Sequence, residues 1–176
     1  MRPIFALAAA CALQVGAPAP AQDQVPVIVA PDETVTLRLD GKGPPRVDRA
    51  PATWTEFETA IARRLVTGVG VDVGDSATAR EHSGLPPAPE IAAGVVRMRF
   101  FLIADRQSVL FIENGQDRAL VYRAVMTRNG RSEPTDVCLI PAHSRAQEHW
   151  PYPIDRLSLS DLHLVEWNGG ATVPCG

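Results

Sequence analysis

The sequence is poor in lysine, and its basic residues are nowhere concentrated. Sixteen of the 17 basic residues are arginine, Lys42 is the single lysine, and the longest basic cluster is the pair Arg63-Arg64. The 20 acidic residues outnumber the basic ones and give a formal net charge of −3. Because clustered basic charge supplies most of a protein's affinity for polyanions, this composition argues against nucleic acid as a partner.

A long apolar run is also missing, except at the N-terminus. There, Arg2 is followed by an apolar stretch from Ile4 to Val15 and by Ala19-Pro20-Ala21, which has the small-x-small pattern of a cleavage site. The stretch is shorter than the ~20 residues that a membrane-spanning helix needs. We therefore expect a signal peptide over residues 1–21, cleavage before Gln22, and a periplasmic or secreted mature chain without a transmembrane segment.

Cysteine is scarce as well. Cys11 falls within the expected signal peptide, where a lipoprotein signal is the alternative, so Cys138 and Cys175 are the pair in the mature chain. An oxidising compartment favours a disulfide between them. The bond would close a loop of 38 residues, for which the chain-entropy model gives roughly 4 kcal/mol of stabilisation. A reactive thiol and an intermolecular disulfide are the alternatives.

The N-terminal half of the mature chain alternates between strand patterns and loops. Period-two alternation predicts short strands around Val25–Val29 and Val35–Leu39. The first strand is expected at a sheet edge, because Pro26 has no amide hydrogen to donate. The residues from Gly41 to Pro51 are expected to form a loop, and those from Gly74 to Gly94 a second, irregular connection.

A single amphipathic helix is predicted between these two loops. Thr53 and Glu56 have the spacing of a capping box, which marks a helix start. An apolar stripe with spacings of three and four residues follows and consists of Trp54, Phe57, Ile61 and Leu65. We expect a helix over about residues 54–66 that packs this stripe on one sheet face and leaves Arg63 and Arg64 in solvent.

The pattern of the second half of the chain predicts a series of strands. Four strand patterns span residues 95–104, 109–114, 119–127 and 135–140, and a last one lies near residues 162–167. Asn114-Gly115 and Asn129-Gly130 supply hairpin turns, which predicts a β-meander. Arg97 and Arg99 alternate with apolar residues, so one face of the meander is expected in the core and the other at least partly wet.

Together these patterns predict one domain over residues 22–176. The meander and a disulfide-tied C-terminal segment occupy residues 95–176, while the N-terminal strands, the helix and a loop occupy residues 22–94. Because a sheet with one apolar face needs a second layer, we expect a mainly β protein. The fold class is an antiparallel β-sandwich of immunoglobulin-like size with one amphipathic helix.

Several blocks of the C-terminal half resemble an uncharacterised family of small exported proteins of Gram-negative bacteria. The blocks are Phe111-Ile112-Glu113-Asn114-Gly115, Leu120-Val121-Tyr122-Arg123-Ala124-Val125, Thr135-Asp136-Val137-Cys138 and Glu148-His149-Trp150-Pro151. The resemblance implies an exported protein whose C-terminal half is the structural unit. It implies no activity.

The block Gly74-Asp75-Ser76 is the sharpest catalytic candidate, because it resembles the nucleophile block of Gly-Asp-Ser-Leu hydrolases. In those enzymes a serine attacks an ester carbonyl, and an aspartate orients the histidine that takes its proton. Ser76, Asp161 and His163 would take these roles. The spacing of Asp161 to His163 is two residues instead of three, residue 77 is alanine, and a meander is not the doubly wound fold of those enzymes. A turn at Ser76 and a histidine on a strand is the simpler interpretation.

A metal site is the next candidate considered. His143, Glu148 and His149 fall within seven residues, and Asp136 lies just upstream. Zinc needs three or four converging ligands, and this spacing matches no known ligand framework. We therefore expect no metal and no cofactor.

The aromatic segment around Trp150 is the candidate binding surface. His149, Trp150 and Tyr152 lie among prolines, and such loops make contacts at low entropic cost. The alternative is that Trp150 and Tyr152 close one end of the sandwich. A partner strand could also add to the Val25–Val29 edge.

These observations lead to an expectation of an exported, non-catalytic binding or envelope-interaction module. Its partner would be an envelope protein or a small ligand. A Gly-Asp-Ser-Leu hydrolase and a purely structural envelope protein are the alternatives, since the same sandwich fold hosts many activities.

Overall fold

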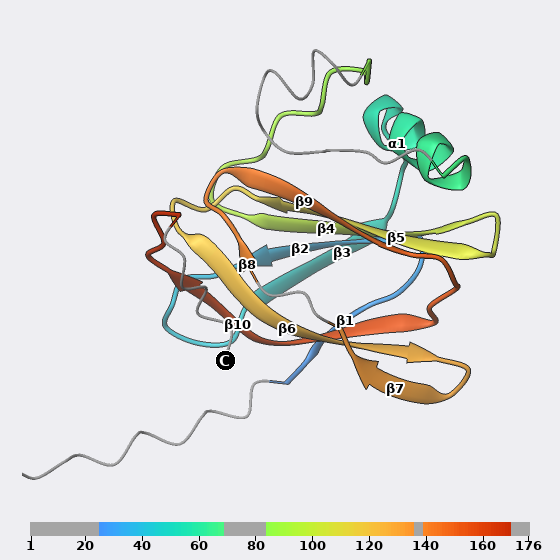
Figure 1. Ribbon diagram of the computed structural model, residues 1–176. Helices are drawn as coiled ribbons and strands as arrows, with labels where there is room; N and C mark the ends of the chain where they lie inside the picture. The colour runs from blue at the N-terminus through green and yellow to red at the C-terminus, as the bar shows by residue number, and fades with distance from the viewer. Residues whose placement is uncertain (1–24, 69–83, 136–138, 170–176) are drawn as a thin grey trace, which may run out of the picture.

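The structure, a computed structural model, describes residues 25–68, 84–135 and 139–169. It is an antiparallel β-sandwich with one helix, which confirms the fold class predicted from the sequence (Figure 1). Sheet A contains, in spatial order, β1 (Val27–Val29), β10 (Arg156–Val165), β6 (Ala119–Arg128) and β7 (Arg131–Pro134), and β8 (Leu139–Ile140) also pairs with β6. Sheet B contains β3 (Arg46–Pro51), β2 (Glu33–Arg38), β4 (Val96–Ile103), β5 (Gln107–Asn114) and β9 (Ser144–Trp150), and the helix α1 spans Glu56–Val66.

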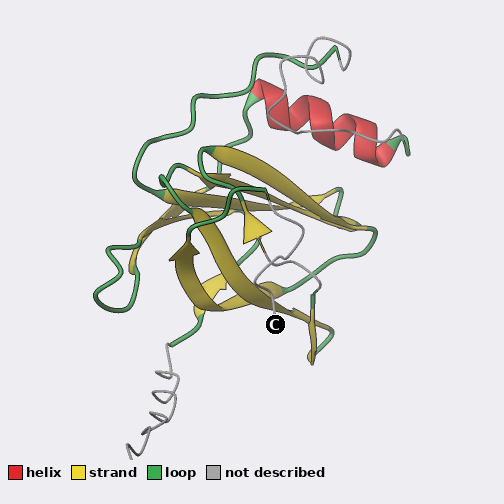
Figure 2. Ribbon diagram, turned by 60° about the vertical axis from the view of Figure 1, so that its left-hand side comes forward, coloured by secondary structure: helices red, strands yellow, loops and turns green. Residues whose placement is uncertain are grey.

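Sheet B is the middle one of three layers, with sheet A on one face and α1 on the other (Figure 2). The core between the sheets is apolar, and its largest fully buried side chains include Tyr122, Phe100, Leu37, Met98, Leu120, Leu157 and Leu159. A second cluster lies between sheet B and the helix and consists of Phe57, Ile61, Phe101, Val109 and Phe111. The outer face of sheet B, expected to be partly wet, is therefore covered over β4 and β5.

The first two predicted strands are confirmed as β1 and β2, and they lie in different sheets. Val27 and Val29 are buried from sheet A, while Val35 and Leu37 are buried from sheet B. Asp32 adopts a positive φ of 58° in the turn that carries the chain between them. As predicted from Pro26, β1 forms an edge of sheet A and pairs with β10 alone among the described strands.

The prediction of a loop from Gly41 to Pro51 is wrong, because residues 46–51 form the edge strand β3. This strand pairs with β2 over six residues, from Glu33 opposite Pro51 to Arg38 opposite Arg46. All of its residues are exposed. Since neither face of β3 is buried, its sequence carries no apolar alternation, and backbone hydrogen bonds to β2 hold it instead. Its charged side chains discourage pairing with another chain.

The predicted helix is confirmed, but its capping box lies two residues later than expected. Thr55, and not Thr53, is the N-cap: its Oγ1 accepts a hydrogen bond from the Glu58 backbone N–H at 3.2 Å. The Glu58 carboxylate in turn accepts from the Thr55 backbone N–H at 2.9 Å. Both Thr53-x-x-Glu56 and Thr55-x-x-Glu58 fit the motif, and the packing of Glu58 against sheet B selects the second.

The predicted meander is wrong at Asn114-Gly115, where the chain crosses from sheet B to sheet A instead of forming a hairpin. Asn114 lies at the centre of this crossing, because its amide nitrogen donates to three carbonyl oxygens and its oxygen accepts from the Gln116 N–H. The three carbonyls belong to Arg118, Ile140 and Pro141. Gly115 packs so tightly that a Cβ atom there would lie 1.9 Å from the carbonyl oxygen of Ala92.

The second predicted turn, Asn129-Gly130, is confirmed as a hairpin between β6 and β7. Both residues have positive φ, 50° and 73°, as a type I′ turn requires. The strand after this turn is residues 131–134, before the predicted range of 135–140, of which residues 139–140 form β8. The last predicted strand is the second half of β10, which contains an irregularity in register between Ser160 and His163.

Several predictions lie outside the described residues. They are the signal peptide over residues 1–21, the Gly74-Asp75-Ser76 block, Asp136, and the disulfide between Cys138 and Cys175. Within the part of the chain that the structure describes, no helix is long and apolar enough to cross a membrane.

Candidate functional site

Aromatic side chains at the N-terminal end of the helix pack against sheet B. The indole of Trp54 stacks on Phe101 of β4, with ring centroids 3.9 Å apart and an interplanar angle of 22°. Its edge also meets Phe111 of β5 at 6.3 Å. Phe57 and Ile61 are buried below the helix. These contacts hold the first turns of α1 close to the sheet.

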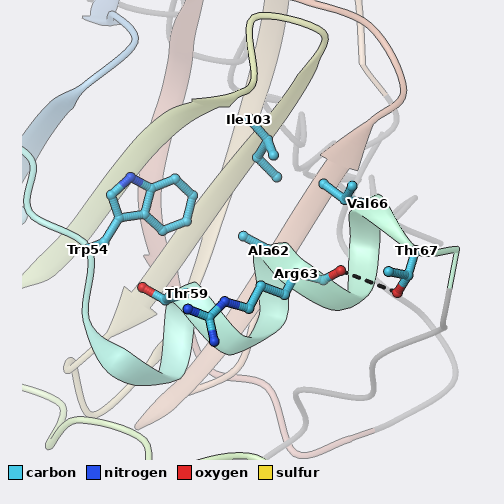
Figure 3. A pocket seen from close by; sticks show the side chains of 7 residues that line it. All are labelled: Trp54, Thr59, Ala62, Arg63, Val66, Thr67 and Ile103. Atoms are coloured by element: carbon cyan, nitrogen blue, oxygen red, sulfur yellow. Dashed lines mark hydrogen bonds between the residues drawn. The ribbon is translucent and has the colours of Figure 1, made fainter.

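An open apolar groove of about 510 Å³ lies between α1 and the end of β4 (Figure 3). We call it the α1 groove; it is lined by the apolar side chains of Trp54, Ala62, Val66 and Ile103 and by Thr59, Arg63 and Thr67. In the close-up, Trp54, Ile103 and Val66 surround the space above Ala62. Its volume falls within the range of about 300–1,000 Å³ that is typical of small-molecule sites.

The groove leaves apolar surface in contact with solvent. Val66, in the last turn of α1, is 55% exposed although it is a large apolar residue. Ile103 ends β4 just before a turn in which Ala104 and Asp105 have positive φ values of 50° and 55°. The strand β4 therefore ends beside the groove. The four apolar side chains therefore form a concave, ligand-accessible surface.

The polar residues of the groove are placed along one face of the helix. Thr67 Oγ1 donates to the carbonyl oxygens of Arg63 and Arg64 at 3.2 and 2.9 Å. These hydrogen bonds pair two carbonyl groups of the last helical turn. Arg63 is exposed, and no ion pair or hydrogen bond joins its guanidinium to another described residue. Of the described residues that line the groove, Arg63 is the one that carries a charge.

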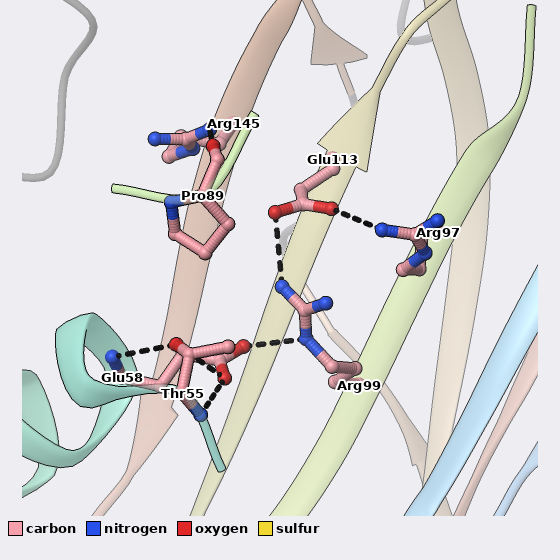
Figure 4. A network of polar contacts seen from close by, with 7 residues as sticks. All are labelled: Thr55, Glu58, Pro89, Arg97, Arg99, Glu113 and Arg145. Carbon is pink, nitrogen blue, oxygen red and sulfur yellow. Dashed lines mark hydrogen bonds and ion pairs between the residues drawn. The ribbon is translucent and has the colours of Figure 1, made fainter. Parts of the chain in front are cut away.

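A second polar site lies under the other end of the helix, where four charged side chains form a chain of ion pairs (Figure 4). Arg99 Nε donates to Glu58 Oε1 at 2.5 Å, and Arg99 Nη2 donates to Glu113 Oε1 at 2.9 Å. The other oxygen of Glu113 accepts from Arg97 at 3.4 Å. Glu58, Arg99 and Glu113 are all buried. Both carboxylates are held by arginine, so the site is suited to fastening the helix and not to acid–base chemistry.

Arg145 of β9 connects the same layer to the segment before β4. Its Nη2 atom donates to the carbonyl oxygen of Pro89 at 2.6 Å (Figure 4), and its guanidinium carbon lies 5.6 Å from the centre of the Phe57 ring. Arg145 pairs in register with Glu113, which pairs with Arg97 on the next strand. Charges of alternating sign therefore form a row across sheet B, which stabilises the face that the helix covers.

The aromatic candidates do not form one contact surface. Trp150 is 9% exposed and belongs to the core between the sheets. Tyr152 packs against that core, and Arg128 lies over its ring at 4.1 Å. His149 points to the opposite face of β9 and its Nε2 lies 2.9 Å from Gln107 Oε1. Burial lowers the pKa of His149 and so favours the neutral ring. Trp150 and Tyr152 thus pack with the core between the sheets.

The described members of the catalytic candidate set do not show the orientation that a triad needs. The Asp161 carboxylate lies 3.0 Å from Arg123 Nε, whereas the His163 ring contacts the backbone oxygen of Asp161 at 2.6 Å. Asp161 and His163 are exposed. In a triad, it is the carboxylate that orients the histidine. Ser76 lies outside the described residues, so the third member of the set stays a prediction.

The described metal candidates are also separated from one another. His143 Nε2 pairs with Asp117 at 3.0 Å at an exposed site. Glu148 and His149 are neighbours on a strand, so their side chains point to opposite faces of the sheet. Within the described ranges, no group of three histidine, cysteine, aspartate or glutamate side chains could hold a metal ion.

No protein-family model, no curated protein and no solved structure matches the chain. The resemblance of its C-terminal half to small exported proteins therefore stays a prediction. Among the residues that the structure describes, the α1 groove is the concave surface best suited to a ligand. Sequence reasoning placed Trp54 in the apolar stripe of the helix and Arg63 in solvent, and it assigned neither residue to a site. The signal available for the groove was the apolar pair Ala62 and Val66, one turn apart beside the predicted stripe.

Proposed function

We propose that the protein is an exported, non-catalytic binding module that holds a small apolar ligand in the α1 groove. The observation that carries this proposal is the groove itself, an open concave surface with Val66 55% exposed and Trp54 at its side. Export rests on the predicted signal peptide over residues 1–21. A small ligand fits the groove better than a protein partner does, because the exposed apolar surface is concave and local.

The chemistry of the lining supports binding over catalysis. The described residues that line the groove include no histidine, cysteine, aspartate or glutamate. Among these residues, the hydroxyls of Thr59 and Thr67 have no base to activate them as nucleophiles. Burial of apolar ligand surface would supply most of the affinity, at roughly 25 cal/mol per Å².

The groove is tested by filling it. Val66→Trp should place an indole between Trp54 and Ile103, and should weaken binding of the neutral apolar fluorophore N-phenyl-1-naphthylamine at least about tenfold, because the ligand then has no concave surface to bury against. The measurement is a fluorescence titration of the purified mature protein. Val47→Trp is the matched control, since Val47 is an exposed valine on β3, at 38% exposure, away from the groove.

The outcomes separate the groove from non-specific binding. Saturable binding by the wild type and by Val47→Trp, with loss in Val66→Trp, supports the proposal. Equal affinity in the two variants would place the ligand elsewhere, and lack of saturable binding by the wild type would reject a binding groove. Circular dichroism and thermal unfolding of both variants show whether a loss comes from unfolding.

Export is tested separately by mass spectrometry of the protein from fractionated cells. The processed form should begin at Gln22 and appear in the periplasmic or secreted fraction. A processed protein that keeps Met1 would contradict export by this signal peptide. Titration of the same sample with a thiol reagent should find no free thiol if Cys138 and Cys175 are bonded.

A further inference from the structure

We infer that the ligand of the α1 groove is a free, single-chain anionic amphiphile whose negative group contacts Arg63. This inference rests on the proposed binding function and adds the chemical class of the ligand. The juxtaposition that carries it is an apolar space formed by four side chains with the exposed cation of Arg63 at its border, the one charge among the described lining residues.

The groove has an apolar part and a polar part. Ala62, Val66 and Ile103 lie around the apolar part, while the Arg63 side chain runs along the helix towards Thr59 (Figure 3). This direction agrees with the general rule that helix side chains lean towards the N-terminus. The guanidinium is therefore directed towards Thr59 and away from the last turn of the helix (Figure 3).

The charge at the polar part favours an anion. Arg63 has no carboxylate partner among the described residues, in contrast to Arg99, which is bound by Glu58 and Glu113. The carbonyl oxygens at the end of α1, whose partial charges would repel an anion, already accept hydrogen bonds from Thr67. A carboxylate next to Arg63 would gain a charge-assisted hydrogen bond from the guanidinium and a second one from Thr59.

The size of the groove limits the occupant to a small molecule. A volume of about 510 Å³ belongs to the class of small-ligand pockets. A single acyl chain buries its methylene groups against Trp54, Val66 and Ile103, and its head group stays at the open border where Arg63 is exposed. The same head-group chemistry occurs in membrane lipids, so the experiment includes a lipid surface as a separate arm.

The test compares three ten-carbon amphiphiles that differ in head-group charge. Decanoate, 1-decanol and decyltrimethylammonium are titrated into the mature protein by isothermal titration calorimetry at low ionic strength, below the concentrations at which they aggregate. Decanoate should bind most tightly. Arg63→Gln should weaken decanoate binding roughly threefold, as expected for an ion pair at an exposed site, and leave decanol binding unchanged. Added salt should reduce the difference.

Arg156→Gln is the matched control, because Arg156 is an exposed arginine at the start of β10 in the other sheet. It should bind all three compounds as the wild type does. Vesicles of phosphatidylglycerol form the fourth arm, with sedimentation as the measurement. Free decanoate binding without sedimentation on vesicles supports the inference.

The possible failures are distinguishable. If decanoate and decanol bind equally and Arg63→Gln has no effect, the anionic class is wrong while the apolar groove stands. A preference for decyltrimethylammonium would overturn the inference in the same way. Binding to vesicles without binding of free decanoate would replace the small ligand with a membrane surface. If none of the three amphiphiles binds and N-phenyl-1-naphthylamine does not bind either, the proposed function fails as well.

Discussion

The two faces of sheet B are packed by opposite kinds of chemistry. Towards sheet A, β4 contributes Val96, Met98 and Phe100, which are fully buried among apolar side chains. Towards the helix, the same strand contributes Arg97 and Arg99 together with Phe101.

This difference shows that one strand can support two unlike interfaces. The core between the sheets is packed from apolar side chains. The helix layer also contains buried ion pairs, and it leaves an apolar groove open at its end. The sandwich therefore provides the stable body of the protein, and the helix layer carries the α1 groove, where we propose that a ligand binds. The predictions below test this division, from the largest expected effect at neutral pH to the smallest, and a pH dependence follows them.

The largest effect is expected from removing the buried cation of the helix layer. Arg99→Met should destabilise the protein by about 3–5 kcal/mol, because it leaves the buried carboxylates of Glu58 and Glu113 without their shared partner. Urea unfolding measures this change. Arg97→Met is the control on the same strand: its ion pair is longer and its side chain is 31% exposed, so the loss should be at most about 1 kcal/mol.

Combining Arg99→Met with Glu113→Gln should recover part of the lost stability, since one of the two buried carboxylates that lose Arg99 is then replaced by a neutral amide. If Arg99→Met costs no more than Arg97→Met, the helix layer does not depend on this charge network.

The next effect concerns the crossing that joins the sheet carrying the helix to the sheet without one. Gly115→Ala should destabilise the protein by about 1–3 kcal/mol, because the added Cβ meets backbone atoms of Ala92 that cannot move freely. Gly43→Ala is the control, since a Cβ at Gly43 meets no atom within 4 Å. A neutral Gly115→Ala, measured by thermal unfolding, would mean that the chain does not cross as closely as described.

A smaller effect should distinguish the two candidate helix caps. Thr55→Ala should cost about 1 kcal/mol, because the Glu58 N–H loses its hydrogen-bond acceptor. Thr53→Ala, at an exposed position that the sequence pattern favoured, should change stability by less than about 0.5 kcal/mol. Chemical denaturation of both variants gives the comparison, and the reverse ranking would restore the cap predicted from sequence.

The smallest effect at neutral pH is expected in the core between the sheets. The Tyr122 hydroxyl is buried and has no hydrogen-bond partner among the residues that the structure describes, so Tyr122→Phe should change stability by no more than about 1 kcal/mol, in the stabilising direction if at all. A large loss would show that the hydroxyl has a partner after all, and that this core is not purely apolar in its energetics.

The same residue predicts a difference at high pH. Burial, and to a lesser extent the Glu148 carboxylate, raise the pKa of Tyr122 well above its ordinary value. Above the unfolded pKa of about 10, the unfolded chain releases a proton that the folded chain keeps, so stability falls by about 1.4 kcal/mol per pH unit from this group. Tyr122→Phe should remove that part of the alkaline loss, as measured by urea unfolding between neutral and alkaline pH.

Much of the fold could be predicted because local patterns record which face of an element is buried. The alternation of Val27 with Val29 and of Val35 with Leu37 marks two strands, and the stripe that includes Phe57 and Ile61 marks the helix. Asn129-Gly130 marks a turn, since both residues tolerate positive φ. Each of these signals lies within a few residues of the structure that it specifies.

The remainder could not be predicted because residues distant in sequence decide it. Asn114-Gly115 has the composition of a hairpin turn, but carbonyls from Ile140 and Pro141 convert it into a crossing between sheets. The sequence of β3 shows no alternation of buried and exposed residues, so the strand is recognised from its backbone pairing with β2. The α1 groove arises where Val66 of the helix meets Ile103 of β4.

The sequence by itself determined the fold class, which is mainly β, and the position of the helix. It also gave rise to the expectation of export. These properties follow from residue type and short-range periodicity, which act within single elements. Only the tertiary structure decided which sheet each strand joins, why buried arginine is tolerated beneath the helix, and where a groove is left open. Such features depend on contacts between elements, and the energy of burying a charge or leaving an apolar surface exposed is set by neighbours that the local sequence does not contain.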